Sequence, residues 1–185
     1  MIIGVDIGSR NLAIVGGSVE NRKFVLRVCR LVDLGRGSLS ACIHRLVDVL
    51  DEMKLPTEVL IEQQHAINQR AYALGHALLM YYASKRVQVR FRSAVSKFNR
   101  FVHLEMIGKE NVGRGNKAAR KRLAIQLTRT ITTKLQIPLD LDSFTKKDDI
   151  ADAFLYCFAE LMDDIDLERI DERRILRVPL ELDIG

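Results

Sequence analysis

Residues 2–8, IIGVDIG, decide the fold: a short run of β-branched residues carries one acid, Asp6, and ends in a glycine turn. Such a run bounded by glycine is typical of a buried strand. A carboxylate without a partner inside a buried strand costs several kcal/mol. Hydrogen bonds, a basic partner or a metal must therefore compensate the charge of Asp6.

The pattern after this strand alternates between strand and helix signals. Strands are predicted at residues 12–19, 24–34, 59–62 and 87–91. Helices are predicted from Ser38 or Ser40 to about Met53, over 67–84, over 117–135 and from Thr145 onward. Three successive strands followed by alternating helices and strands predict an α/β fold with a mixed sheet. We expect a single domain over residues 1–185, with the tail from about residue 168 least defined.

The composition excludes several classes of protein. The 185 residues are enough to bury a substantial core, and the hydrophobic share of 48% and charged share of 29% are ordinary for a soluble protein. The sequence has no run of about 18 apolar residues, so no membrane span is predicted. The first residues, MIIGVDIG, lack the basic region of a signal peptide. Cys29, Cys42 and Cys157 are far apart and without metal-ligand spacing, so we expect reduced thiols in an intracellular protein.

The middle of the chain is strongly basic. Residues 85–134 contain fourteen Lys or Arg against two acids, whereas residues 140–185 contain fourteen acids against six bases. Such a concentration of cations is typical of a protein that binds a polyanion, because neutralising phosphates releases counterions. A solvated helical face is the alternative, but it would carry interspersed acids. The charge distribution favours nucleic acid as the partner.

Three further acids fall where they could join Asp6. Glu62 ends a predicted strand, and ligands of α/β sheets bind at the carboxyl ends of strands. Asp149 and Asp152, at positions i and i+3, share one face of the last predicted helix. Four carboxylates together would form an all-oxygen cluster, which suits magnesium or manganese rather than zinc. The alternative is that each acid is satisfied locally.

The stretch 145–154, TKKDDIADAF, has a third aspartate, Asp148. If Thr145 is the N-cap, Asp148 stands at N3, where an acid returns a hydrogen bond to the cap and interacts favourably with the helix dipole. On this interpretation Asp148 is structural, whereas Asp149 and Asp152 face the metals. The helical wheel does not decide whether Asp148 or Asp149 faces the metals together with Asp152. Around the helix axis, Asp148 lies about 40° from Asp152 and Asp149 lies about 60° from it.

Three segments in this order resemble the RuvC-type Holliday-junction resolvases of the ribonuclease H-like superfamily: GVDIGSRNLA at 4–13, VLIEQQ at 59–64 and TKKDDIADAF at 145–154. The pairing of IEQQ with KKDDIADAF is most similar to the poxvirus branch. The resemblance covers residues 1 to about 160 and implies a ribonuclease H-like fold, with a mixed five-stranded sheet flanked by helices. One position departs, because bacterial members carry an aromatic residue three places after the strand glutamate and this chain has His65 there. A base-stacking role at that position is therefore not implied.

The resemblance also implies the site and its metals. It implies that Asp6, Glu62, Asp149 and Asp152 bind two divalent cations per active site, Mg²⁺ with Mn²⁺ as a substitute. The family pattern, an acid three residues before the DA pair, assigns this role to Asp149 rather than to its neighbour. A basic residue at the start of the third long helix falls on Lys117, which joins the four acids as a predicted catalytic residue. We expect the phosphates of DNA to be bound by Lys97, Arg114, Lys117, Arg120, Lys121 and Arg122.

The implied activity is that of a magnesium-dependent, structure-selective endonuclease. A resolvase of this type makes paired cuts in a four-way DNA junction and leaves 5′ phosphates that a ligase can reseal. Two metals about 4 Å apart serve this chemistry, one activating water and one stabilising the leaving oxygen. In a poxvirus such an enzyme resolves replication and recombination intermediates in the host cytoplasm.

Two symmetric cuts need two active sites related by a two-fold axis, so we expect a homodimer. The predicted helix 67–84 is the candidate interface. One apolar stripe of this helix fits the sheet and comprises Ala71, Leu74, Leu78, Tyr81 and Tyr82. Ala73, Ala77 and Met80 leave a second face apolar, and a helix apolar on two faces is buried on two. The alternative is a central helix buried within one subunit.

Three rival functions remain open. A related ribonuclease H-like nuclease would act on structured RNA or on other branched DNA, and the phosphate and metal chemistry is common to both. A non-catalytic nucleic-acid-binding protein would explain the basic middle but not the acids. The stretch 6–13, DIGSRNLA, also resembles the first phosphate loop of actin-like ATPases and sugar kinases, which need a second such loop and a second domain. The chain has room for neither, so no nucleotide cofactor is expected.

Overall fold

The computed structural model of the chain describes residues 1–104, 106–108, 112 and 117–166. Its strands are β1 (Ile2–Ile7), β2 (Asn11–Glu20), β3 (Lys23–Asp33), β4 (Glu58–Glu62) and β5 (Gln88–Arg92). They form one sheet in the order β3-β2-β1-β4-β5. β2 runs antiparallel to both β1 and β3, whereas β4 is parallel to β1 and β5 is parallel to β4. The predicted mixed five-stranded sheet is confirmed.

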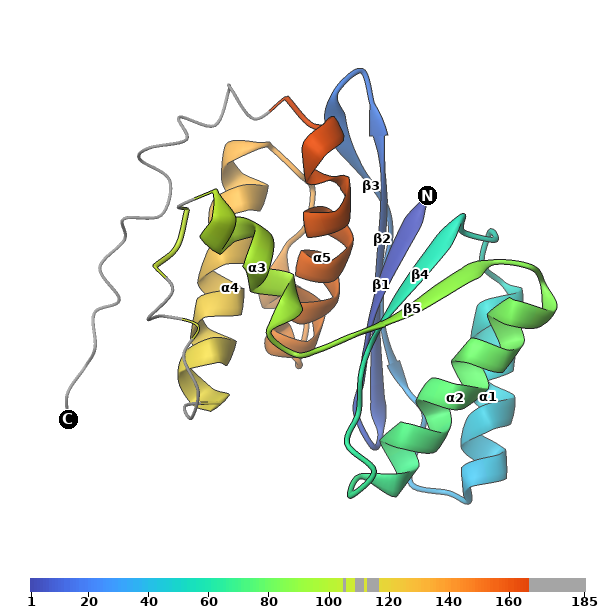
Figure 1. The fold of residues 1–185 in the computed structure, drawn as a ribbon. Coiled ribbons are helices and arrows are strands. Elements are labelled where there is room, and N and C mark those ends of the chain that lie inside the picture. The colour runs from blue at the N-terminus through green and yellow to red at the C-terminus, as the bar shows by residue number, and fades with distance from the viewer. Residues whose placement is uncertain (105, 109–111, 113–116, 167–185) are drawn as a thin grey trace.

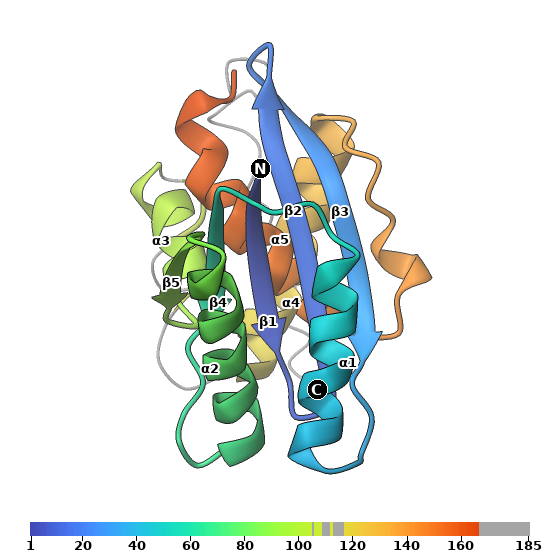
Figure 2. The same cartoon turned by 90° about the vertical axis from the view of Figure 1, so that its right-hand side faces the viewer.

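Helices cover both faces of the sheet (Figures 1 and 2). On one face lie α1 (Leu39–Asp51) and α2 (Gln69–Ser84). On the other lie α3 (Ser96–His103), α4 (Lys117–Lys134) and α5 (Lys147–Leu161), together with the 3₁₀ turns η2 (Leu141–Ser143) and η3 (Met162–Asp164). No helix within the described ranges is long and apolar enough to cross a membrane.

Strand β1 sends its side chains alternately to the two faces. The side chains of β1 that are buried beneath α1 and α2 are Ile3, Val5 and Ile7. Gly4 and Asp6, on the opposite side of the pleat, therefore face α5. A Cβ atom at Gly4 would overlap the carbonyl oxygen of Ala153, so glycine is needed for α5 to approach the strand this closely. This approach brings the first turns of α5 next to Asp6.

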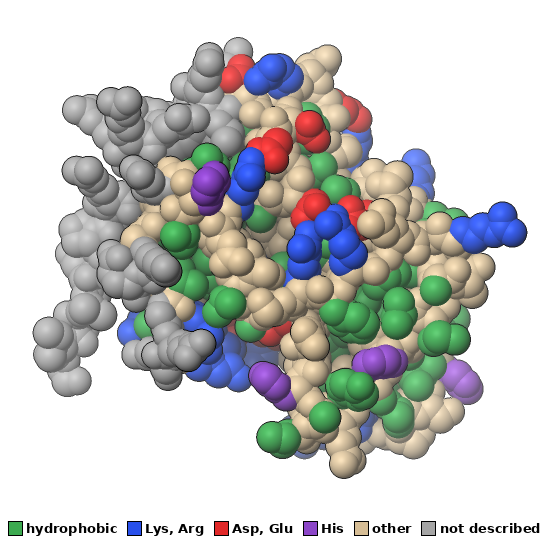
Figure 3. All heavy atoms as spheres, in the orientation of Figure 1, with side chains coloured by type: hydrophobic (Ala, Val, Ile, Leu, Met, Phe, Trp, Pro, Cys, Tyr) green, Lys and Arg blue, Asp and Glu red, His purple; other side chains and the backbone are tan. Residues whose placement is uncertain are grey.

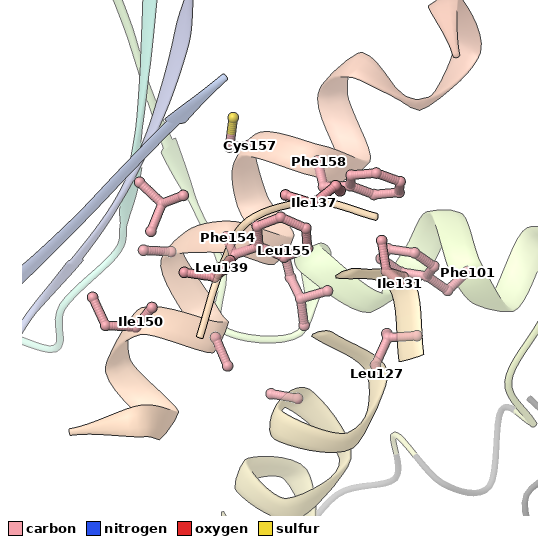
Figure 4. Packing of buried hydrophobic residues seen from close by; sticks show 14 of the residues in the cluster. Phe101, Leu127, Ile131, Ile137, Leu139, Ile150, Phe154, Leu155, Cys157 and Phe158 are labelled. Atoms are coloured by element: carbon pink, nitrogen blue, oxygen red, sulfur yellow. The ribbon is translucent and has the colours of Figure 1, made fainter. Parts of the chain in front are cut away.

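Helix α5 lies between the sheet and the outer helices, so it is held from two sides. Figure 4 shows Phe154 and Phe158 of α5 near Leu127 and Ile131 of α4 and Phe101 of α3, and all five side chains are buried. The rings of Phe154 and Phe158 stack with centroids 5.5 Å apart, and those of Phe101 and Phe158 stack at 6.3 Å. Close packing of this kind resists displacement. The packing of α5 therefore fixes the positions of its aspartates relative to the sheet.

The helices differ from the sequence-based expectations in two details, and the structure also decides which of two serines caps α1. Helix α3 was not predicted. The predicted N-cap at Thr145 is wrong, because α5 begins at Lys147 and the cap position is Lys146, whose side chain makes no capping hydrogen bond. Of the two serines proposed to cap α1, Ser38 does so, with its Oγ accepting a hydrogen bond from the Ala41 N–H at 3.2 Å.

Candidate active site

Three carboxylates from three elements meet at one edge of the sheet. Val5 of β1 pairs with Ile61 of β4 in parallel register, which places the next residues, Asp6 and Glu62, side by side. Asp152 reaches the same point from α5. Carboxylate oxygens of Asp6, Glu62 and Asp152 all lie within 4.8 Å of one another. The sheet register and the close approach of α5 thus build an all-oxygen cluster at the carboxyl ends of the two strands.

The cluster is electrostatically unfavourable without a cation. Burial raises the pKa of Asp6 well above its usual range, and the charges of Glu62 and Asp152 raise it further. Burial also raises the pKa of Asp152 to about 6, although the positive charge of Lys97 acts in the opposite direction. The Oδ1 atom of Asp152 is buried and has no hydrogen-bond partner. A divalent cation would satisfy this oxygen and relieve the repulsion, so the residues fit a magnesium or manganese site.

Lys97, from α3, lies inside the carboxylate cluster. Its Nζ is 2.7 Å from Asp152 Oδ2 and 3.6 Å from Glu62 Oε2, and its side chain is only 4% exposed. The ammonium also lies 5.2 Å from the ring centroid of Tyr156. Lys97 was predicted to bind DNA from the basic segment. The structure buries its charge among the acids, where it neutralises part of their repulsion.

Tyr156 was not recognised in the sequence as part of the site. Its hydroxyl lies 3.3 Å from Glu62 Oε2 and 3.0 Å from the carbonyl oxygen of Ser93, both of which accept its hydrogen bond. Burial and the charge of Glu62 raise the pKa of Tyr156, so the phenol stays protonated and remains a donor. The hydroxyl therefore fixes the orientation of the Glu62 carboxylate. Its position four residues after Asp152, on the same face of α5, is the signal that could have revealed it.

The other two aspartates of α5 occupy different environments. Asp149 is half-buried and is not one of the three clustered carboxylates, but its charge contributes to the raised pKa of Asp6. Burial and the neighbouring Asp148 raise the pKa of Asp149 itself. Partial burial alone would raise the pKa of Asp148, but an ion pair with Lys121 lowers it below its usual value. Asp148 thus joins α5 to α4.

A hollow of about 520 Å³ opens beside the cluster. Its lining includes Glu62 and Asp152, the loop residues 63–65 after β4, and Lys117, Arg120 and Lys121 from the first turns of α4. Acidic side chains lie recessed near the lower centre of Figure 3, with Lys and Arg side chains beside them.

Four of the six predicted phosphate-binding residues, Lys97, Lys117, Arg120 and Lys121, line this hollow. Arg122 is exposed and does not line the hollow. Arg114 lies outside the described residues. His65, which replaces the family aromatic, does line it.

A second hollow lies next to Asp149 and has a volume of about 680 Å³. Its lining includes residues 8–11 after β1 and Lys146 before α5. Arg10 in this lining is held by Asp33, whose Oδ1 lies 3.0 Å from the Arg10 Nε. Positively charged side chains therefore flank the carboxylates on both sides.

The sheet order, the helices on both faces and the carboxylates at the strand ends define a protein of ribonuclease H-like fold. The fowlpox virus resolvase, solved in complex with its substrate Holliday junction DNA, is similar with a TM-score of 0.65 and 18% identity, over 89% of this chain and 99% of that chain. The yeast mitochondrial Holliday junction resolvase Ydc2 gives a TM-score of 0.63 and 17% identity, over 95% and 86% of the two chains. RuvC of Thermus thermophilus gives a TM-score of 0.57 and 18% identity, over 88% of this chain and 96% of that chain.

The chain belongs to the poxvirus A22 protein family, whose model matches residues 1–164. This match confirms the resemblance to the poxvirus branch that the three sequence segments carried. A comparison with curated proteins finds no match.

Proposed function

We propose that this protein is a metal-dependent endonuclease that resolves four-way (Holliday) DNA junctions by paired cuts. The observation that carries the proposal is the buried carboxylate cluster with its unpartnered Asp152 Oδ1, facing a hollow lined with lysine and arginine. Membership of the poxvirus A22 family supports it, as does the similarity to a fowlpox resolvase bound to a Holliday junction.

The carboxylates are the metal ligands in this proposal. Asp6, Glu62 and Asp152 hold the divalent cations, and Asp149 joins them from the preceding turn of α5. We propose two Mg²⁺ per site, with Mn²⁺ as a substitute, because all donors are carboxylate oxygens. Bound cations of this kind supply an activated water near neutral pH and stabilise the departing oxygen. Tyr156 orients one ligand through its hydrogen bond.

The cations of α4 position the phosphate backbone. Lys117 and Arg120 line the hollow beside the carboxylates, where they would hold the scissile phosphate and add positive charge as the transition state forms. Lys121 shares its charge with Asp148 and contributes less. Arg122, which is exposed outside the hollow, would contact phosphates farther along the DNA, and Arg114 is proposed as a further phosphate-binding residue. The cut would leave 5′ phosphates that a ligase can reseal.

The proposed enzyme is a homodimer formed through α2. The stripe predicted to pack on the sheet does so, since Ala71, Leu74, Leu78 and Tyr82 are buried and Tyr81 is partly buried. The outward face of the helix remains apolar, with Met80 69% exposed. A second copy would cover this face and would place two active sites about a two-fold axis, as paired cuts require.

We further propose that the whole chain acts as one nuclease domain. Residues 167–185, the C-terminal tail, lie outside the described residues. Family membership supports a viral protein that processes replication and recombination intermediates in the host cytoplasm.

Cleavage of a substrate panel tests this proposal. A four-way junction, a duplex, a flap and a structured RNA are each incubated with wild-type protein and with Asp6→Asn, in Mg²⁺, in Mn²⁺ and in EDTA. We expect wild-type protein to cut the junction in either metal but not in EDTA, and Asp6→Asn to bind it without cutting. Preferential cleavage of RNA or of the flap would favour a related nuclease, and binding without cleavage in any metal would favour a non-catalytic binding protein.

A further inference from the structure

A ladder of three aromatic side chains lies beside the active site, on the side of α2 that faces β5. The ring centroids of Tyr72 and His76 are 4.3 Å apart with planes tilted by 37°, and those of His76 and Phe91 are 5.5 Å apart with a tilt of 34°. Tyr72, at the outer end, is 43% exposed. Hydrophobic side chains gather over α2 at the lower right of Figure 3. Tyr72 and His76 are exposed and present their rings to solvent, whereas Phe91 also packs against the core.

The ladder borders a pocket of about 100 Å³ that adjoins the carboxylate site. Its lining comes from Tyr72, Gly75, His76, Phe91 and residues 62–64. Residues 62–64 also line the larger hollow beside the carboxylates. A nucleic-acid strand with a phosphate at Glu62 would therefore have an adjacent nucleotide within reach of this pocket.

The rings are held in place before any ligand binds. The Nδ1 atom of His76 lies 2.9 Å from the carbonyl oxygen of Tyr72, one helical turn earlier. Because a carbonyl oxygen only accepts, Nδ1 carries the hydrogen, and Nε2 remains free to accept one from a ligand. Phe91 supports the other side of the imidazole from β5. A fixed aromatic surface of this kind binds flat ligands without first having to become ordered.

We propose that this pocket holds one unpaired nucleobase of the substrate strand, stacked on Tyr72, when the neighbouring phosphate lies at the carboxylates. The inference rests on the proposed function and names the substrate feature that the site would read. Aromatic faces favour the faces of a base, and the amide groups of Gln63 and Gln64 in the pocket lining match its polar edge. In continuous duplex the faces of each base are covered by its neighbours. Only a branch point or another unpaired site offers a base that can enter, so the pocket would select branched DNA.

A thermodynamic cycle between the ring and the base tests the proposal. Junctions are prepared with an abasic residue at each of the two positions on either side of the cut, and binding is measured in EDTA so that no DNA is cleaved. The protein variants are Tyr72→Leu, which removes the ring, and Tyr72→Phe, which keeps it. A stack between a base and an aromatic side chain changes affinity roughly 5- to 150-fold. We expect wild-type protein and Tyr72→Phe to lose this factor at one abasic position, and Tyr72→Leu to bind intact and abasic junctions equally.

A third variant, Gly75→Ala, narrows the pocket while leaving all three rings of the ladder in place. Its added Cβ would lie 3.6 Å from Phe91 Cε1 and from Ile7 Cδ1, which is ordinary contact, so the protein should fold normally. The methyl group narrows the pocket, and we expect it to reduce the coupling at the same abasic position. If Tyr72→Leu fails to fold, as judged by thermal unfolding, the coupling measured with Gly75→Ala tests the proposal in its place.

Three outcomes would overturn the proposal or separate it from the proposed function. If removing a base changes the affinity of wild-type protein and of Tyr72→Leu by the same factor, to within twofold, at every abasic position, no base enters the pocket. A change in sedimentation from dimer to monomer in Tyr72→Leu would assign the ladder to contact with a second copy of the chain and overturn the proposal. Junction cleavage without coupling between Tyr72 and a base would overturn only the base pocket. Coupling without any cleavage would overturn only the proposed nuclease function.

Discussion

The metal-free protein should become less stable as the pH rises from 5 to 8, and Mg²⁺ should reverse this loss. The cause is burial of acids in the carboxylate cluster, which raises the pKa of Asp152 to about 6 from an ordinary value of 3.8. A group whose folded pKa is raised stabilises the protein fully below its unfolded pKa, and this stability is lost as the pH rises through the folded pKa. The burial of Asp6 and Asp149 acts in the same direction.

The size of the effect follows from Asp152. Its full shift corresponds to about 3 kcal/mol, of which about 1.4 kcal/mol is lost between pH 5 and pH 8. For a chain of this length that loss lowers Tm by roughly 3–6 °C, before Asp6 and Asp149 add to it. Asp148 does not offset it, because its lowered pKa gives stability that is lost only as the pH falls below about 4.

Thermal unfolding in EDTA at pH 5 and pH 8, repeated with Mg²⁺, measures the effect. At a free Mg²⁺ concentration about one hundred times Kd, one bound ion adds about 2.7 kcal/mol. We expect this gain at pH 8 and a smaller one at pH 5, where protonation competes with the metal. The matched variant Asp6→Asn removes one buried charge, so it should be more stable than wild type in EDTA at pH 8 and should gain little from Mg²⁺. A Tm in EDTA that rises between pH 5 and pH 8, or no gain from Mg²⁺ at pH 8, would refute the reasoning.

Four substitutions test other parts of the account. Gly4→Ala should push α5 away from β1 and cost about 1–3 kcal/mol of stability together with Mg²⁺ affinity; a normal Tm with normal Mg²⁺ binding would show that the close approach is not needed. Tyr156→Phe should fold normally but weaken Mg²⁺ binding or turnover about 10- to 100-fold, as seen by titration calorimetry and cleavage rates, and unchanged values would remove its positioning role. Asp148→Asn breaks the ion pair with Lys121 and should lower stability by about 0.5–1 kcal/mol with turnover largely intact; a stable but inactive variant would make Asp148 a metal ligand. Ala77→Arg should give monomers by sedimentation that nick a junction without resolving it, and a monomeric wild type bound as one copy per junction would exclude the dimer.

The strands and four of the helices could be predicted because their residues alternate or repeat with a clear period. Ile3, Val5 and Ile7 mark a buried strand by alternation alone, and glycine marks where it turns. Helix α3 could not be found this way. Its only buried apolar side chains are Phe98 and Phe101, set among basic and polar residues that look like a solvated loop.

The site shows the same division between local and long-range signals. Asp6, Glu62 and Asp152 stood out because each is an acid where a strand or helix buries it, and the structure brings these three together. The position of Lys97 depends on how α3 packs against α5, which no local pattern encodes. Asp148 likewise pairs with Lys121 of α4 rather than with a cap at Thr145, and no local pattern encodes this contact between two helices.

Cleavage of a supercoiled plasmid that extrudes a cruciform tests the central claim most directly. Two cuts within one binding event convert the plasmid to linear DNA, whereas a single cut leaves a nicked circle. With Mg²⁺ we expect wild-type protein to give linear product whose ends DNA ligase reseals, and we expect Asp6→Asn to bind the cruciform and cut neither strand. Nicked circles as the main product of the wild-type protein, or linear product formed in EDTA or by Asp6→Asn, would contradict paired, metal-dependent resolution by this carboxylate cluster.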